Sequence, residues 1–294
     1  MKTRFFAATA ALVVCTASFA QSYSQPYPVG QNPTACATKL ATYDPGTGSI
    51  KLWLPKGGRI TPSENHWSMK TIDQGYGPKM ATDGSLAYVP TETPVANVSG
   101  DIRTIAPDGT VRDFTSVSDR LQPLGWNSTT TNGGPWLVVL RKAATFCQLE
   151  LRDPSSFKLL EIFFTSSNPS AITGAWIPDM GQLDWLLAGE GFCKQSPSGS
   201  PIIGLWGYSF LVHASSGYSI TDPSVEPSKS GRIVFDKSDS VAGEHVYLLS
   251  PTDGSLSVLK TGNGDYATSG ATWIGPGLLA TSEAGTNRVW IMKV

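Results

Sequence analysis

The stretch Gly77-Pro-Lys-Met-Ala-Thr-Asp-Gly84, which continues as Leu86-Ala-Tyr-Val89 and closes at Glu92, decides the fold because the chain repeats its design. The apolar positions on either side of Gly84 are typical of two strands joined by a tight turn, since glycine accepts the positive φ that such turns need. The same pattern recurs from Gly174-Ala-Trp-Ile to Glu190 and from Gly270-Ala-Thr-Trp-Ile to Glu283. The sequence therefore predicts a β-hairpin that recurs along the chain.

Weaker copies fall between these hairpins. Glycines at positions 30, 125 and 231 open further apolar stretches, so the units start at residues 30, 77, 125, 174, 231 and 270. A second hairpin lies between successive starts, with turn sequences such as Pro107-Asp-Gly109 and Thr252-Asp-Gly254. A period of this size with four strands per unit is typical of a β-propeller, in which each blade buries its faces against its neighbours.

We predict an all-β protein with one β-propeller domain over residues 21–294. Six blades are preferred, with five as the alternative. The segment after Gly270 has room for three strands, of which Arg288-Val-Trp-Ile-Met292 is the last. We therefore expect a strand from the N-terminal segment to pair with the C-terminal strands and close the ring, because closure removes the exposed sheet edges.

Residues 1–20 have the pattern of a secretory signal peptide. Met1-Lys-Thr-Arg4 is basic, residues 5–14 are apolar, and Ser18-Phe-Ala20 places small residues where a signal peptidase would cut. The apolar run is too short to span a bilayer, and no later run reaches that length. We expect a mature protein that starts at Gln21, has no membrane span and is secreted or lies in the lumen of the secretory pathway.

This location bears on the cysteines and on two asparagines. Cys36, Cys147 and Cys193 remain after the signal peptide, so one disulfide and one thiol are expected. A Cys147–Cys193 pair would link adjacent blades, and Cys36 could instead hold the N-terminal segment; the sequence leaves both open. Asn97-Val-Ser and Asn127-Ser-Thr are predicted N-glycosylation sites.

The charge balance excludes one class of partner. Without Lys2 and Arg4, 20 of the 22 basic residues remain against 23 acidic ones, a net charge of about −3. There is no basic stripe to neutralise phosphates, so nucleic acid is not expected as a partner. The sequence also lacks a Gly-x-Ser-x-Gly elbow, a His-Glu-x-x-His pair, a phosphate-binding glycine loop and a Cys-x-x-Cys motif. Motifs alone therefore name no chemistry.

Position in the repeat predicts where a site would lie. In a propeller the innermost strands line a central channel, and small molecules bind where these strands and the loops after the second strands open on one face. The predicted starts of the inner strands are occupied by Lys79, Met80, Trp126, Trp176, Arg232 and Trp273, and the ends of the second strands by Glu92, Arg141, Glu190 and Glu283. Flat apolar walls with a few charges suit a small apolar or phenolic ligand.

These positions lead to predicted roles. The substrate-binding residues are Trp126, Trp176, Trp273, Met80, Glu190 and Glu283, and the catalytic donors are Lys79, His66 and Arg232. His66 belongs to the loop 55–76, which is long enough to form a pocket wall. Each tryptophan has an alternative role, because it could fill the space between wedge-shaped blades. The glutamates could likewise be solvated strand ends.

The preferred interpretation needs no cofactor and no metal. In an alternative, Glu92, Glu190 and Glu283 converge on a divalent cation such as Ca²⁺, because hard cations take oxygen ligands. Such a site would also need amide or carboxylate companions near the channel, for which Asn65, Asn127 and Asp179 are the candidates.

The Gly-x-x-Trp-Ile hairpins, the Pro-Asp-Gly turns and the signal peptide together resemble the secreted fungal β-propellers grouped with the SMP-30/gluconolactonase-like superfamily. Lactonases of that superfamily hold a central divalent metal with a glutamate near the N-terminus, whereas this chain has no glutamate between Gln21 and Ser63. The chain is also similar to the hetero-Diels–Alderases of fungal natural-product pathways. That resemblance implies an enzyme without cofactor that joins a reactive quinone methide to a terpene alkene.

Three functions follow as hypotheses. The first is a cofactor-free, hetero-Diels–Alder-type pericyclase of secondary metabolism, in which Trp126, Trp176 and Trp273 align two reactants and Lys79 or another donor polarises a carbonyl. It requires the three tryptophans to share a cavity. The second hypothesis is a metal-dependent hydrolase that uses the glutamates. The third is a non-catalytic secreted protein that binds a small molecule.

Overall fold

The computed structural model of the chain describes residues 22–25, 27–91, 102–116, 118–127, 134–167, 176–179, 182–188, 191–194, 219–226, 232–239, 243–250 and 255–294. The predicted signal peptide lies outside these residues. The regular structure within them is β-strand. This part of the chain holds no apolar helix of membrane-spanning length.

The strands form antiparallel sheets. The first sheet contains β2 (Gln31–Cys36), β3 (Lys39–Asp44), β4 (Ser49–Pro55), β5 (Trp67–Met80), β6 (Leu86–Pro90), β7 (Ile102–Ile105) and β8 (Val111–Phe114), and β1 (Ser22–Gln25) pairs with β5. The second contains β9 (Arg120–Asn127), β10 (Trp136–Lys142), β11 (Cys147–Arg152) and β12 (Leu159–Ser166). The third sheet contains β13 (Trp176–Asp179), β14 (Gln182–Ala188) and β15 (Gly191–Lys194). The fourth contains β16 (Ser219–Val225), β17 (Ile233–Asp239), β18 (Gly243–Leu249) and β19 (Leu256–Val258). The fifth contains β20 (Ala267–Gly275), β21 (Leu278–Glu283) and β22 (Val289–Lys293).

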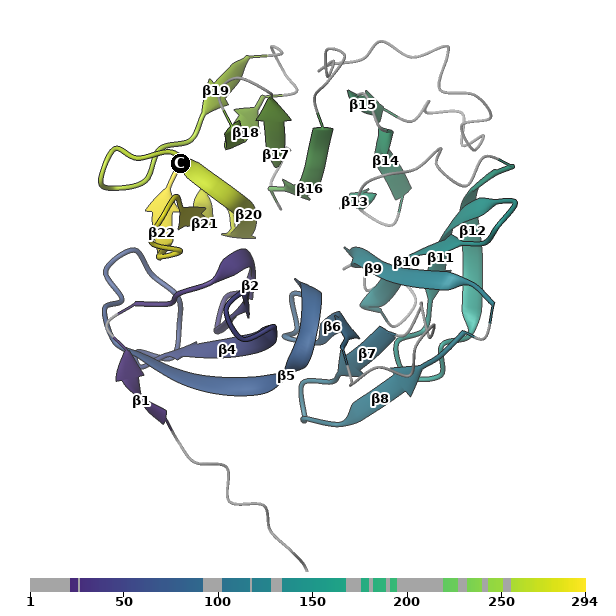
Figure 1. Ribbon diagram of the computed structural model, residues 1–294, viewed down its shortest axis with the longest axis horizontal. Helices are drawn as coiled ribbons and strands as arrows, with labels where there is room; N and C mark the ends of the chain where they lie inside the picture. The colour runs from purple at the N-terminus through teal and green to yellow at the C-terminus, as the bar shows by residue number, and fades with distance from the viewer. Residues whose placement is uncertain are drawn as a thin grey trace, which may run out of the picture.

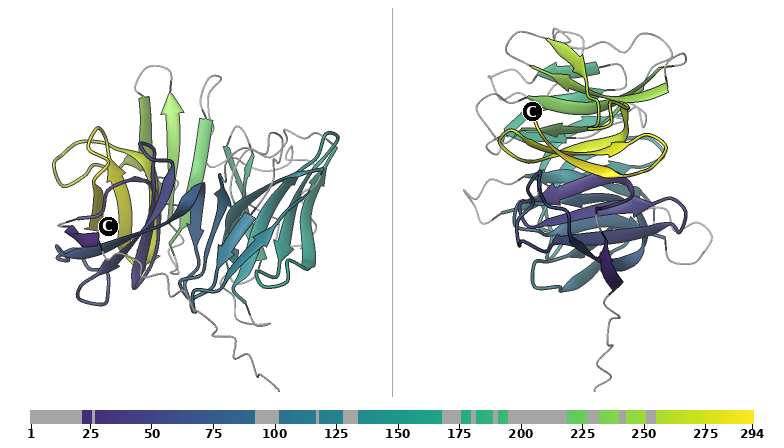
Figure 2. Two further views of the ribbon diagram at one scale, coloured as in Figure 1. Left: turned by 60° about the horizontal axis from the view of Figure 1, so that its bottom comes forward. Right: turned by 90° about the vertical axis from the view of Figure 1, so that its left-hand side faces the viewer.

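The sheets stand around a common centre, with β2, β5, β9, β13, β16 and β20 nearest to it (Figure 1). Neighbouring sheets pack face against face, as β20–β22 and β2–β4 do in the edge-on view of Figure 2. Ala35 and Trp53 from one of these sheets share a hydrophobic cluster with Ala280 and Val289 from the other. The core is therefore a series of apolar layers between sheets, and the predicted all-β propeller class is confirmed.

One strand, β5, belongs to two parts of the first sheet. Its residues 67–74 pair with β4 and with β1, whereas residues 75–80 pair with β6. The change falls at Gly75, where a Cβ atom would lie 2.7 Å from the carbonyl oxygen of Val89. Because only glycine fits this contact, β5 can pass from the outer side of one four-stranded unit to the innermost position of the next.

Five of the innermost strands are bulged. Register shifts fall at Asn32–Pro33 in β2, Gly77–Pro78 in β5, Leu124 in β9, Asp222–Pro223 in β16 and residues 268–270 in β20. Proline is tolerated there because the channel side of an innermost strand is a sheet edge, where its missing N–H breaks no ladder bond. Gly77 and Gly270 adopt φ values of +62° and +86° in these bulges. Both glycines thus lie inside a strand, and the predicted strand starts at residues 77 and 270 are wrong.

The N-terminal part of the described chain meets β22. Val29 and Arg288 form an isolated antiparallel bridge. The Arg288 guanidinium lies 4.2 Å from the centre of the Tyr27 ring and 3.9 Å from that of the Trp290 ring. However, β1 pairs with β5, and β20–β22 form a three-stranded sheet in the part of the chain that the structure describes. The predicted completion of this sheet by an N-terminal strand is therefore not confirmed.

The cysteines settle one of the disulfide alternatives. Cys36 is a buried thiol whose Sγ lies 3.6 Å from Oγ1 of Thr38, so a disulfide at Cys36 is contradicted. Cys147 is fully buried on β11, and the side chain of Cys193 lies outside the described residues. The Cys147–Cys193 pair stays a prediction.

Candidate functional site

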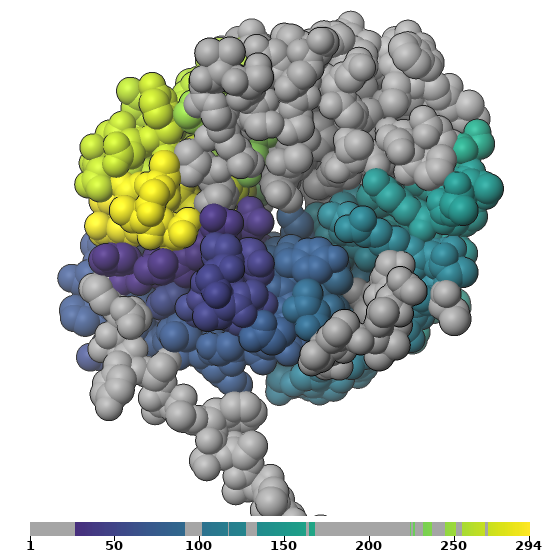
Figure 3. Space-filling model, viewed as in Figure 1, coloured from purple at the N-terminus to yellow at the C-terminus, as the bar shows by residue number. Residues whose placement is uncertain are grey.

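A pocket of about 190 Å³ lies next to the centre of the molecule. It is lined by Asn32, Tyr76, Gly77, Lys79, Val89, Gln122 and Pro123. These residues come from β6 and from the innermost strands β2, β5 and β9. The face of the molecule in Figure 3 is hollowed near its middle, beside the purple and blue residues that include β2 and β5.

The bulge in β5 brings Tyr76 and Lys79 to the same side of the strand. Residues three apart in a regular strand point to opposite faces, because side chains alternate. Here Tyr76 pairs with Val89 and Lys79 pairs with Ala87, so three steps along β5 match two steps along β6. The extra residue returns both side chains to one face. Ala87 on that face packs against Trp126, which shows that the face looks toward β9.

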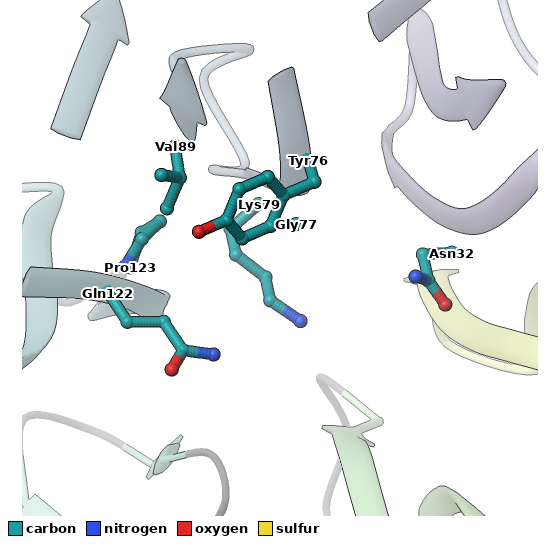
Figure 4. A pocket seen from close by; sticks show the side chains of 7 residues that line it. All are labelled: Asn32, Tyr76, Gly77, Lys79, Val89, Gln122 and Pro123. Carbon is teal, nitrogen blue, oxygen red and sulfur yellow. The ribbon is translucent and has the colours of Figure 1, made fainter. Parts of the chain in front are cut away.

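The pocket offers a cation, two amides and an aromatic ring. In Figure 4 the Tyr76 ring, the Lys79 side chain and the Gln122 amide extend toward one open region, and Asn32 lies across it. Among the lining residues that the structure describes, Lys79 carries the one charge. Tyr76 is 39% exposed, so a planar ligand could contact its ring. Ammonium and amide N–H groups pair well with carboxylate, phenolate or carbonyl oxygens.

Two hydrogen bonds from the innermost strands on either side hold the backbone beside Lys79. The indole Nε1–H of Trp126 donates to the carbonyl oxygen of Lys79 at 2.8 Å. The N–H of Met80 donates to Oγ1 of Thr34 at 2.8 Å. The backbone that carries Lys79 is therefore tied to β9 on one side and to β2 on the other.

Trp126 and Trp273 do not form the predicted walls of a shared cavity. Each is 5% exposed and packs in an apolar layer between neighbouring sheets. Trp126 pairs with Leu137 near the start of β10, and Trp273 pairs with Leu279 near the start of β21. The two tryptophans thus occupy the later parts of their strands, because the glycines that precede them mark bulges and not strand starts. Filling the wedge between blades is their structural role.

Glu283, the one predicted glutamate that the structure describes, lies at the opposite end of its hairpin from Trp273. Glu283 pairs with Ala267 at the start of β20, whereas Trp273 lies near the end of that strand. Glu283 is 1% exposed and accepts hydrogen bonds from Asn263 Nδ2 at 2.8 Å and Thr286 Oγ1 at 2.6 Å. Burial opposes ionisation, but these hydrogen bonds outweigh it and lower the pKa of Glu283. Glu283 therefore joins two loops and does not line the pocket.

Met80 and Arg232 also have structural surroundings. Met80 is buried in an apolar cluster between β5 and β2–β4. The Arg232 guanidinium binds both carboxylate oxygens of Glu226, at 2.8 and 3.0 Å, and lies 5.0 Å from the Trp273 ring. The hydrogen bond to Glu226 raises the pKa of Arg232. Glu226 in turn accepts from the N–H of Gly277 at 2.6 Å, so this ion pair joins the sheets of β16–β19 and β20–β22. Neither predicted residue lines the pocket.

His66 is far from the pocket. It immediately precedes β5, and Lys79 lies near the end of that strand. The part of β5 that leads from His66 to Lys79 is thirteen residues long, which at about 3.3 Å per residue is roughly 40 Å. The ring of His66 is exposed, and its Nδ1 lies 2.5 Å from Oδ1 of Asn65. His66 and Lys79 therefore cannot act on the same small molecule.

Several predicted positions lie outside the described residues. Glu92, Glu190 and Asn97 are among them, and only the backbone of Trp176 is described, at the start of β13. Asn127 is 2% exposed at the end of β9, and a buried amide cannot carry a glycan, so glycosylation there is contradicted. Within the described ranges, histidine, cysteine and acidic side chains do not gather in groups of three or more that could hold a metal.

Of the predicted site residues, Lys79 alone lines the pocket in the part of the chain that the structure describes. Asn32, Tyr76 and Gln122 were not predicted from the sequence. A usable signal was present, because prolines recur at 33, 78 and 123 with a spacing of 45 residues (78 − 33 and 123 − 78). Each proline lies at or beside a bulge of an innermost strand. The residues that flank such prolines are the ones that reach the pocket.

Comparison with known proteins shows a fold and no family. No family model matches the chain, and no curated protein does. The β-propeller domain of Cps50 (Swd1) from Myceliophteria thermophila matches with a TM-score of 0.50 at 13% identity, over 92% of this chain and 99% of that one. A chain of the mitotic checkpoint complex matches with a TM-score of 0.50 at 13% identity, over 100% and 99%. A catalytically inactive virginiamycin B lyase from Staphylococcus aureus, crystallised with quinupristin, matches with a TM-score of 0.50 at 9% identity, over 94% and 98%. The chain is thus similar in architecture to known β-propellers.

Proposed function

We propose that this protein is a secreted β-propeller that binds a small aromatic molecule through an anionic or carbonyl oxygen in the pocket at Lys79. The observation that carries the proposal is the lining itself: one ammonium group, two amides and an exposed tyrosine ring. An oxygen anion gains a charge-assisted hydrogen bond from Lys79, and the flat part of the molecule gains contact with Tyr76.

The size of the pocket limits the ligand. Pockets that enclose drug-sized molecules measure roughly 300–1,000 Å³. The pocket at Lys79 measures about 190 Å³, which suits a single substituted ring or one end of a larger molecule. A phenol, a benzoate or the quinoid end of a natural product would meet this limit.

As a finer proposal, the bound molecule is a quinone methide and the protein is a hetero-Diels–Alder-type pericyclase. In that reaction the quinone methide and an alkene form one C–C and one C–O bond, and nothing leaves. The protein must align two reactants and polarise the quinone methide oxygen, which is a task for N–H donors such as Lys79 and Gln122. In this proposal the ring of Tyr76, in place of Trp126, Trp176 and Trp273, forms the apolar wall against which the reactants align.

The metal-dependent hydrolase is the less favoured function. Of the three glutamates that it requires, Glu283 is held by Thr286 and Asn263 away from the pocket. We further propose that the propeller has six blades and that the first and last blades are joined at the Val29–Arg288 bridge. We also propose that the protein is secreted after removal of residues 1–20. These features would expose the pocket to molecules outside the cell.

A titration tests the binding proposal. We expect 4-hydroxybenzoate to bind more tightly than its neutral analogue 4-hydroxybenzamide. The change Lys79→Met removes the cation and keeps a similar apolar stem, so it should remove most of this preference, about tenfold or more for a charge-assisted hydrogen bond. Lys56→Met, at an exposed loop position, is the matched control and should bind as the native protein does. Equal affinities for acid and amide in the native protein would refute binding through an anionic oxygen.

A second assay tests catalysis. Mass spectrometry would follow adduct formation from an ortho-quinone methide generated in solution and an alkene, with native protein, with Lys79→Met and without protein. Faster or stereoselective adduct formation that Lys79→Met loses would support the pericyclase. Binding of 4-hydroxybenzoate without any effect on adducts would leave a binding protein and reject the finer proposal.

A further inference from the structure

We propose that Trp126, which is buried outside the pocket, is a positioning residue that aims Lys79 and so sets the preference for anionic ligands. This inference rests on the proposed function. Its starting point is the 2.8 Å hydrogen bond from Trp126 Nε1 to the carbonyl oxygen of Lys79. Trp126 is 5% exposed and is absent from the pocket wall, so its effect must pass through that backbone group.

Trp126 and Thr34 hold opposite sides of one peptide unit. The carbonyl of Lys79 and the N–H of Met80 belong to the same peptide plane, and in a trans peptide they point in opposite directions. Trp126 on β9 binds the carbonyl, and Thr34 on β2 binds the N–H, each at 2.8 Å. A single peptide group of β5 is therefore clamped between the two neighbouring innermost strands.

The two hydrogen bonds of this clamp restrain β5 directly after its bulge. Gly77 and Pro78 form the bulge directly before Lys79, and Gly77 has a φ of +62° with no atom within 4 Å of its would-be Cβ. A bulge disturbs the ladder between β5 and β6, so nearby peptide planes lose part of their restraint. Rotation of the clamped plane would move the Cα–Cβ bond of Lys79 and turn the ammonium away from Gln122. Without the clamp, the pocket would keep its ring contact with Tyr76 and lose its selective contact with an anion.

Trp273 provides a matched control. It is also 5% exposed, and it also packs in an apolar layer between sheets, on β20. Its Nε1 makes no hydrogen bond to any residue that the structure describes. Trp126→Phe therefore loses ring area and a hydrogen bond, whereas Trp273→Phe loses ring area and part of the contact with Arg232 but no hydrogen bond to a described residue. Thr34→Val removes the other half of the clamp while it keeps the shape of the side chain.

The experiment measures the ratio of affinities for 4-hydroxybenzoate and 4-hydroxybenzamide in the native protein and in these three variants. We expect Trp126→Phe and Thr34→Val to lower the ratio about three- to tenfold, in proportion to one lost hydrogen bond. Trp273→Phe should keep the native ratio, even where its melting temperature falls as much as that of Trp126→Phe. An unchanged ratio in Trp126→Phe, or an equal loss in Trp273→Phe, would overturn the inference.

Hydrogen exchange separates this inference from the proposed function. The Met80 amide should exchange slowly in the native protein, quickly in Thr34→Val, faster than native in Trp126→Phe, and at the native rate in Trp273→Phe. Fast exchange of this amide in the native protein would show that the clamp does not exist. Slow exchange with no preference for the acid would instead show that the clamp exists and that the proposed ligand class is wrong.

Discussion

The packing between β20 and β2 can be tested by adding one methyl group at each of two bulged glycines. Gly270→Ala and Gly77→Ala both place alanine in a left-handed backbone, with φ values of +86° and +62°. At position 270 the new Cβ would lie 3.0 Å from Cα of Asn32 and 3.3 Å from Cδ of Pro33. At position 77 no atom lies within 4 Å of it.

These distances set the expected free energies. The left-handed conformation costs an alanine about 1–2 kcal/mol at either position. The gain from a less flexible unfolded chain is the same for both substitutions and cancels in their difference. At Gly270 the methyl must also displace the backbone of β2, and overpacking of this kind costs about 1–3 kcal/mol. We therefore expect Gly270→Ala to destabilise the protein by about 1–3 kcal/mol more than Gly77→Ala does.

Equilibrium unfolding in urea measures both changes, provided that the slope with denaturant is unchanged. Gly77→Ala serves as the control for backbone strain, since it shares the conformation and lacks the contact. Equal losses of stability in the two variants would refute the close approach of β20 to β2. A larger loss in Gly77→Ala would refute the description of the bulge in β5 as well.

Three further predictions follow from the buried polar groups. Arg232→Met should lower the free energy of unfolding by about 2–4 kcal/mol, because it removes the cation that pairs with the buried carboxylate of Glu226. The control is Arg120→Met, at an exposed position. Similar losses of stability in both variants would contradict the account. Folding lowers the pKa of Glu283 below 4.5, so its contribution to stability should be complete above pH 4.5 and disappear as the pH falls through the lower folded pKa. The stability difference between the native protein and Glu283→Gln should therefore shrink over that pH range. A constant difference would show that Glu283 is not ionised in the folded state. In a glycosylating host, Asn127→Gln should leave the mass of the attached glycan unchanged, and a loss of glycan would place Asn127 on the surface.

The fold was predictable because it depends on local turn chemistry repeated along the chain. The Gly84 turn and the apolar stretches around it correctly indicated the hairpin of β5 and β6. The role of Gly77 was not predictable from the same pattern. A glycine before an apolar run is compatible with a strand start and with a bulge inside a strand, and only the pairing with β6 distinguishes them.

This one ambiguity explains most of the errors at the site. Because the strand starts were predicted at the glycines, Trp126 and Trp273 were expected where the central channel opens, whereas they lie in the later parts of β9 and β20. Lys79 was identified because it follows Gly77, and it lies directly after the bulge, where its side chain reaches the pocket. Tyr76 was missed because alternation places it opposite Lys79, and the bulge reverses that expectation.

Side-chain contacts and burial that sequence patterns do not reveal caused the remaining errors. Arg232 was proposed as a donor to a ligand, but Glu226 lies six positions earlier and binds it across the connection between β16 and β17. Asn127 is buried at the end of β9, and a glycosylation triplet carries no information about burial. Sequence patterns thus located the strands well and the exposure of single side chains poorly.

The central claim, that the pocket at Lys79 holds an aromatic molecule by an anionic oxygen, is tested most directly by a crystal structure with 4-bromobenzoate. The anomalous signal of bromine locates the molecule without assumptions about its pose. We predict a carboxylate oxygen about 2.7–2.9 Å from Nζ of Lys79 and the ring against Tyr76. A molecule bound elsewhere, or an empty pocket at concentrations that saturate the titration, would contradict the account.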